Sequence, residues 1–194
     1  MPTSLLGPYT RTILVAAVLA VTLGFALSGA RVEVHGGLLP FFEWLETTWF
    51  GYVGKTWGAA FATIQTFHLI GLALLGGAVL AAEGRILGVV LTEVEQGLII
   101  SRCNAVFNIA MAILVATGVF MACGVAVKIY YLPVYWYKML ALGAGAGFHY
   151  LVRQPLVERA PGEVNPWLLK LMAVVSIMVW FTVAATGRWI GFSG

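Results

Sequence analysis

The stretch Ala62–Leu80, ATIQTFHLIGLALLGGAVL, decides the fold of this chain. It is long and apolar enough to cross a bilayer, because a membrane-spanning helix needs about 20 consecutive residues that are predominantly apolar. Apart from threonines, its polar side chains are Gln65 and His68. Polar groups inside a membrane are costly and are usually functional. The segment therefore predicts a spanning helix and raises the question of what its imidazole does.

The composition of the whole chain agrees with a membrane protein. Of its 194 residues, 61% are hydrophobic and only 10% are charged, whereas about a quarter of the residues of a soluble domain are charged. We therefore expect a single all-α integral membrane domain over residues 1–194. The net charge is +3 without any basic run, so nothing indicates a nucleic-acid partner. Cys103 and Cys123 are interpreted as small apolar residues at opposite ends of one helix.

Five stretches are predicted to span the membrane as a bundle with a four-helix core. They are residues 12–29, 58–82, 103–127, 136–152 and 168–189. The first also resembles a secretory signal with a small-residue cleavage site, but we expect it to be retained as a helix. Residues 39–57 combine many aromatic rings with three charges, Glu43, Glu46 and Lys55. This composition predicts an amphipathic helix in the headgroup region.

The distribution of basic residues gives a weak orientation signal. With a cytoplasmic N-terminus, the inner side holds six Lys and Arg residues and the outer side five. Because cytoplasmic loops carry the excess, we expect the N-terminus inside and Gly194 outside. The interfacial segment then lies on the outer surface, where it could anchor the protein in the lipid bilayer or meet a membrane or periplasmic partner subunit.

His68 and His149 are the leading candidates for cofactor binding. His68 lies 13 residues after Lys55, and His149 lies 11 residues after Lys138, on predicted spans that run in the same direction. At about 1.5 Å per residue, the two imidazoles are expected at nearly one depth, facing each other. Haem iron takes axial histidines, so the pair predicts haem b as the cofactor. The alternatives are another metal, copper foremost, a structural hydrogen bond, or a proton relay.

Small and polar neighbours extend this candidate site. Gly71 and Gly145 lie within one turn of the two histidines and would make room for a flat macrocycle. Gly143 and Gly147 have the spacing of small residues that pack spanning helices together.

Three polar side chains complete the set. Gln65 shares the face of His68 and could bond a propionate or a partner helix. Asn108, four residues after Asn104, could contact a quinone headgroup or a propionate, or bond a neighbouring helix. Lys138 could pair with a propionate or extend its ammonium to the interface.

Several short motifs together resemble a family of small bacterial integral membrane proteins of unknown function. They are TFHLIGLALLGG (66–77), EGRILG (83–88), Thr117–Gly118, YWYKM (135–139) and FHY (148–150). The chain departs from the family at Glu83–Gly84, where Asp–Leu is usual. The resemblance implies no activity. More loosely, two histidines in a four-helix core are similar to the haem-binding membrane domains of cytochrome b561-type and copper-resistance D-type proteins.

These observations lead to one favoured function and two competitors. The favoured function is a b-type cytochrome or haem-bearing subunit of the bacterial inner membrane that passes electrons between a partner protein and the quinone pool. The competitors are a haem-free accessory or anchor subunit of a larger complex and a small transporter. No hydrolytic or phosphate-binding motif points to a stand-alone enzyme.

Overall fold

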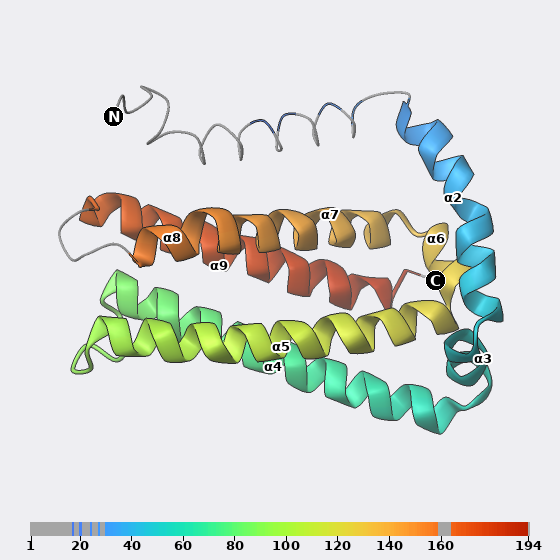
Figure 1. Cartoon of the computed structure of the whole chain (residues 1–194), viewed down its shortest axis with the longest axis horizontal. Coiled ribbons are helices and arrows are strands. Elements are labelled where there is room, and N and C mark those ends of the chain that lie inside the picture. Colours follow the sequence, from blue (N-terminus) through green and yellow to red (C-terminus); the bar gives the residue numbers. More distant parts are fainter. Residues whose placement is uncertain are drawn as a thin grey trace, which may run out of the picture.

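The computed structural model describes residues 17, 20, 24, 27, 30–158 and 164–193, and this part of the chain is helical, without strands (Figure 1). The helices follow one another with short connections. They are α2 (Ala30–Thr47), α3 (Trp49–Thr56), α4 (Gly58–Leu87), α5 (Gln96–Gly124), α6 (Ala126–Tyr130), α7 (Pro133–Phe148), the π-helical turn η2 (His149–Arg153), α8 (Gln154–Val157) and α9 (Pro166–Ile190).

Three described helices, α4, α5 and α9, are long and apolar enough to cross a membrane. The prediction of five spans is therefore not supported. The first predicted span, residues 12–29, lies almost entirely outside the described residues. The fourth, residues 136–152, corresponds to α7, which is α-helical for only 16 residues before η2 begins at His149.

Local sequence explains where the helices begin and end. Pro133 and Pro166 occupy the first turns of α7 and α9, where a residue without an N–H removes no helical hydrogen bond. The side chain of Asn165 caps α9 by accepting a hydrogen bond of 2.9 Å from the Trp167 N–H. Gly88 ends α4 with a φ of +78°, a left-handed conformation that suits glycine.

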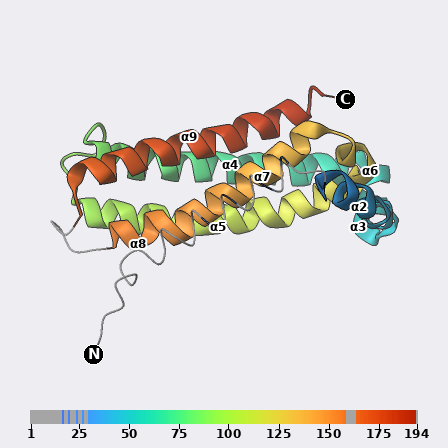
Figure 2. The same cartoon turned by 90° about the horizontal axis from the view of Figure 1, so that it is seen from above.

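The four long helices form a bundle in which α5 packs on α4, α4 on α9, and α9 on α7. Figure 2 shows α7 crossing the bundle from the C-terminal end of α9 toward the N-terminal end of α5. A central apolar cluster holds the four helices together, with Leu75, Phe107, Ala110 and Trp180 among its buried members. The bundle thus has an end near α2 and α3 and an opposite end near α8 (Figure 1).

The predicted single helix over residues 39–57 is in fact two helices that lie across the α2/α3 end of the bundle (Figure 1). Thr48 separates them, because its hydroxyl accepts a hydrogen bond from the Gly51 N–H and caps α3. Phe42 is buried against α6. Other rings of this segment stay exposed: Phe41, Trp44, Trp49, Phe50, Tyr52 and Trp57.

Candidate functional site

His68 projects from α4 and is fixed by α5. Its Nδ1 lies 2.8 Å from the hydroxyl oxygen of Thr117, whose own proton is donated over 2.6 Å to the backbone oxygen of Ile113. A hydroxyl has only one proton to donate, so the Thr117 oxygen accepts a hydrogen bond from the Nδ1–H of His68. The hydrogen-bond network therefore assigns the tautomer with Nδ1–H, and the lone pair of His68 belongs to Nε2.

Gly118 provides the space that this arrangement needs. A Cβ atom at this position would lie 3.4 Å from the Cε1 atom of His68. Thr117 and Gly118 thus act on the same ring, one by a hydrogen bond and the other by its small size. Both belong to one of the motifs that carried the family resemblance.

Lys138 brings a positive charge to the same level from α7. Its aliphatic chain and ammonium lie over Gly187 of α9, where a Cβ atom would be 3.4 Å from both Cε and Nζ. The charged ammonium acts on the His68 ring electrostatically. Among the described residues, no carboxylate and no hydrogen-bond acceptor is paired with it. The helices α4, α5, α7 and α9 therefore each contribute one residue to this part of the bundle. We call it the His68–Lys138 site, and it consists of His68, Thr117, Lys138 and Gly187.

A second polar cluster lies nearer the α8 end and is closed. The Arg153 Nε donates a 2.5 Å hydrogen bond to Glu83, and its Nη1 donates one of 2.8 Å to the Asn104 side chain. Glu83 and Arg153 are only 0% and 1% exposed. The space among these residues is too tight to admit a water molecule. The cluster has the character of a structural clamp joining α4, α5 and η2.

His149 belongs to this second level. Its ring stacks on Phe107, with 3.7 Å between ring centroids and 9° between the planes, and its Nδ1 has no partner among the described residues. His149 and Arg153 are four residues apart in η2 and are both buried in the core.

The structure does not bring the two predicted ligands together. His68 contacts Thr117 and His149 contacts Phe107, ten residues apart on the same helix, which corresponds to about 15 Å. One iron bonds both axial ligands from opposite faces, so the residues do not fit a haem shared by these histidines. The tight packing around His149 points the same way. Within the described residues, no group of three or more His, Cys, Asp or Glu side chains could hold a metal ion.

The expected glycine cradle is occupied by helix packing instead. A Cβ atom at Gly71 would lie 3.1 Å from Ile113, and one at Gly145 would lie 3.0 Å from Val179. These glycines let α4 approach α5 and α7 approach α9. The predicted packing positions Gly143 and Gly147 have nothing within 4 Å, so the contact face of α7 is the one that carries Gly145.

The two predicted amides have different outcomes. Asn108 accepts a 2.8 Å hydrogen bond from the Tyr150 hydroxyl, which is the interhelical alternative. Gln65 lies on the exposed surface of α4 and is not part of the His68–Lys138 site.

Sequence reasoning missed Arg153 as a site residue, and it noted Thr117 only as part of a family motif, without a role in the site. Arg153 is one of the six basic residues that the orientation argument places in water on the inner side. In the structure it is buried and pairs with Glu83, seventy residues away. The sequence did contain a signal for this pair. Glu83 directly follows the predicted span 58–82, and Arg153 directly follows the predicted span 136–152.

The comparisons with known proteins agree with the family resemblance. No curated protein and no solved structure matches the chain. One family model, described as a family of unknown function (DUF6644), matches residues 41–193. This match covers α3 to α9 and therefore both polar levels of the bundle. The chain belongs to the DUF6644 family of unknown function.

Proposed function

We propose that this protein is a membrane subunit that exchanges electrons with the quinone pool, and that a quinol or quinone headgroup binds at the His68–Lys138 site. One observation carries the proposal: Thr117 holds Nδ1 of His68 over 2.8 Å, which leaves Nε2 as a free acceptor, and the Lys138 ammonium has no ion-pair partner among the described residues. Nε2 of His68 is thus a hydrogen-bond acceptor and the Lys138 ammonium is a donor. Both lie inside a membrane bundle, and neither has an obvious structural use.

The chemistry of a quinol matches this pair. One quinol hydroxyl donates its proton to Nε2 of His68, and the oxygen on the other side of the ring accepts a hydrogen bond from Lys138. Oxidation of the quinol to the quinone releases two protons and two electrons. His68 takes one proton and water takes the other, while a one-electron redox centre of a partner protein accepts the electrons in turn. A general base must lie within hydrogen-bond reach of the proton that it removes.

The proposal includes a place in the cell and a topology. We expect the protein in the inner membrane of a bacterium, with α7, η2 and α8 crossing beside α9 as a fourth span. The observation that supports a fourth span is the path of α7. Together with η2 and α8 it extends between the two ends of the bundle, as the three long apolar helices α4, α5 and α9 do (Figure 1). The exposed rings of α2 and α3 suit the headgroup region at one end.

Binding of a tailless benzoquinone to the protein in lipid nanodiscs tests the headgroup site. His68→Ala and Lys138→Met are each expected to weaken binding about tenfold, near the worth of a charge-assisted hydrogen bond. His35→Ala is the matched control, because it removes an imidazole from α2 at the end of the bundle, and it is expected to bind within about twofold of wild type. Equal affinity in all four proteins would show that the headgroup does not bind here.

The haem predicted from the sequence has a test of its own. A visible spectrum of the purified protein, reduced minus oxidised, shows the bands of a b-type haem if one is bound. A bis-histidine spectrum lost in both His68→Ala and His149→Ala would restore the predicted ligand pair, against the separation of about 15 Å between their levels.

The competing accessory-subunit function rests on the closed cluster of Glu83, Arg153 and Asn104, whose hydrogen bonds join α4, α5 and η2. A colourless protein that binds no quinone but co-purifies with a larger membrane complex would favour it.

A further inference from the structure

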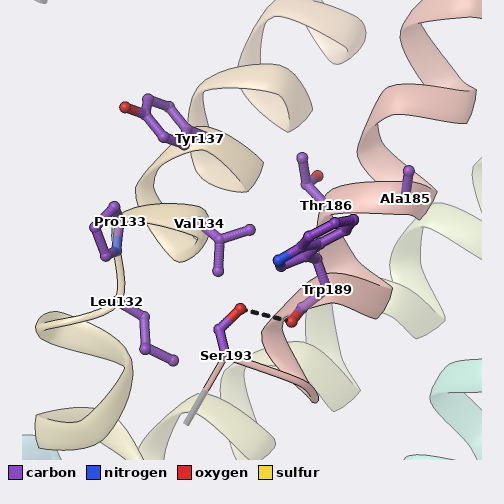
Figure 3. A pocket seen from close by; sticks show the side chains of 8 residues that line it. All are labelled: Leu132, Pro133, Val134, Tyr137, Ala185, Thr186, Trp189 and Ser193. Carbon is purple, nitrogen blue, oxygen red and sulfur yellow. Dashed lines mark hydrogen bonds between the residues drawn. The ribbon is translucent and has the colours of Figure 1, made fainter.

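A groove runs between the start of α7 and the end of α9 (Figure 3). Its volume is about 450 Å³, within the range of roughly 300–1,000 Å³ that is usual for small-molecule sites. Figure 3 shows Pro133, Val134 and Tyr137 on one side and Ala185 and Trp189 on the other.

The groove presents a hydrocarbon surface. Two of its lining residues carry aliphatic hydroxyls, and both are bonded to the backbone of their own helix. Thr186 donates to the Thr182 oxygen over 2.7 Å. Ser193 donates to the Trp189 oxygen over 2.8 Å (Figure 3). These hydroxyls therefore have no need of a polar ligand, and the walls suit an apolar chain.

The groove lies directly beside the His68–Lys138 site. Tyr137 and Thr186 line the groove. Their neighbours in the chain, Lys138 of α7 and Gly187 of α9, contact each other. A Cβ atom at Gly187 would lie 3.4 Å from the Nζ atom of Lys138, so the ammonium lies at the contact between α7 and α9. An amphiphile could thus place its head near the unpaired ammonium and its tail in the groove.

From this continuity we infer that the α7–α9 groove holds the isoprenoid tail of the quinone, so that the quinone enters sideways from the bilayer between α7 and α9. The inference rests on the proposed function and adds the class of ligand, a long-tailed quinone. In a bilayer the tail gains little from leaving lipid, because lipid chains are as apolar as the groove. The groove therefore acts by van der Waals contact with fixed walls, which orients the headgroup toward Lys138.

Two probes with the same benzoquinone head, one with a ten-carbon tail and one without, test the inference in nanodiscs of zwitterionic lipid. Ala185→Phe fills the groove. Val174→Phe is the matched control, because it adds the same ring to another exposed position of α9. Partitioning of each probe into the bilayer is the same for every variant, so differences between variants report on the groove.

We expect Ala185→Phe to weaken binding of the tailed probe at least fivefold and to leave the tailless probe within twofold of wild type, while Val174→Phe changes neither. If the tailed probe binds Ala185→Phe as well as wild type, the groove does not hold the tail, although the headgroup site stands. If oleate displaces the tailed probe from wild type at equal concentration, the groove is a general lipid site and the inference fails. If neither probe binds wild type, the proposed function fails and this inference with it.

Discussion

A single hydroxyl fixes the chemistry of His68. Because Thr117 gives its proton to Ile113, it can only accept from Nδ1, and the free nitrogen is then always Nε2. Thr117→Val removes this acceptor, so the ring can rotate or change tautomer. We expect affinity for the tailless benzoquinone to fall about three- to tenfold, the usual worth of one neutral hydrogen bond.

Thr182→Val is the control for this substitution. Its hydroxyl also donates to its own helix, over 2.9 Å to Met178, but on the exposed face of α9. Nitrogen NMR of the His68 ring should show a change of tautomer population in Thr117→Val alone. Unchanged ring shifts in Thr117→Val would contradict the assigned tautomer.

Glu46 joins three elements at the α2/α3 end. Its carboxylate pairs with Lys55 of α3 and accepts a 2.9 Å hydrogen bond from the Val127 N–H at the start of α6. Burial by itself raises the pKa of Glu46, but the bonds from Lys55 and Val127 outweigh it, so the pKa lies below the usual 4.5. A carboxyl with a lowered pKa stabilises the fold above its unfolded pKa and loses this contribution as the pH falls through the folded value.

Glu46→Gln is therefore expected to lower the free energy of unfolding by about 1 kcal/mol at pH 7. The difference from wild type should shrink as the pH falls below 4.5. Thermal unfolding in detergent at several pH values measures it, and Glu43→Gln, an exposed neighbour on the same helix, should have almost no effect. A difference that persists unchanged in acid would mean that charge plays no part.

At the scale of elements, the buried pair Glu83–Arg153 joins α4 to η2. Removing one partner of a buried pair leaves an unpaired charge and typically costs about 3–5 kcal/mol. We expect Glu83→Leu and Arg153→Met to destabilise the protein by that amount each, and the double variant to recover most of the loss.

Thermal unfolding of these three variants gives the coupling energy. Lys55→Met is the comparison, since it breaks a pair whose lysine side chain is 60% exposed, and it should cost less than about 1 kcal/mol. Additive losses in the double variant would show that the two charges do not depend on each other.

The packing of α7 on α9 depends on Gly145, the middle glycine of residues 143–147 (GAGAG). Gly145→Leu is expected to cost about 1–3 kcal/mol by overpacking, because Val179 already lies 3.0 Å from a Cβ atom at this position. Gly143→Leu, where nothing lies within 4 Å, is expected to be neutral. Comparable melting temperatures for the two variants would place the contact face of α7 elsewhere.

At the scale of the whole molecule, the bundle predicts which segments share a side of the membrane. Val89 and Trp167 lie near the α8 end, whereas Tyr131 and Phe192 lie near the α2/α3 end, and all four are more than 60% exposed. Single cysteines at these positions, in a chain whose Cys103 and Cys123 are replaced by Ala, can be labelled with a membrane-impermeant reagent in intact cells.

We expect the Tyr131 and Phe192 positions to be labelled from outside and the Val89 and Trp167 positions only after lysis. Labelling of Tyr131 and Phe192 on opposite sides would exclude α7 as a fourth span. The reverse pattern for all four would keep the bundle and overturn the orientation derived from the basic residues.

The sequence by itself determined the class of the protein, the start of α4 at Gly58, and both ends of α9 to within two residues. Apolar runs of about 20 residues predict helices, because a helix of that length satisfies all of its own backbone hydrogen bonds in lipid. Gly58, Pro133 and Pro166 lie at helix starts because glycine and proline punctuate a chain wherever it folds. The sequence also singled out His68, Lys138 and Thr117–Gly118.

Only the tertiary structure decided which of these residues meet. The equal depth of the histidines was counted from Lys55, which belongs to the separate helix α3, so the residues between do not measure distance along α4. The contacts of the two histidines on α5, Thr117 for His68 and Phe107 for His149, are ten residues and thus about 15 Å apart. Likewise, the pairing of Glu83 with Arg153 and the choice of Gly145 depend on which faces the helices turn toward each other, and that is fixed by packing between distant segments.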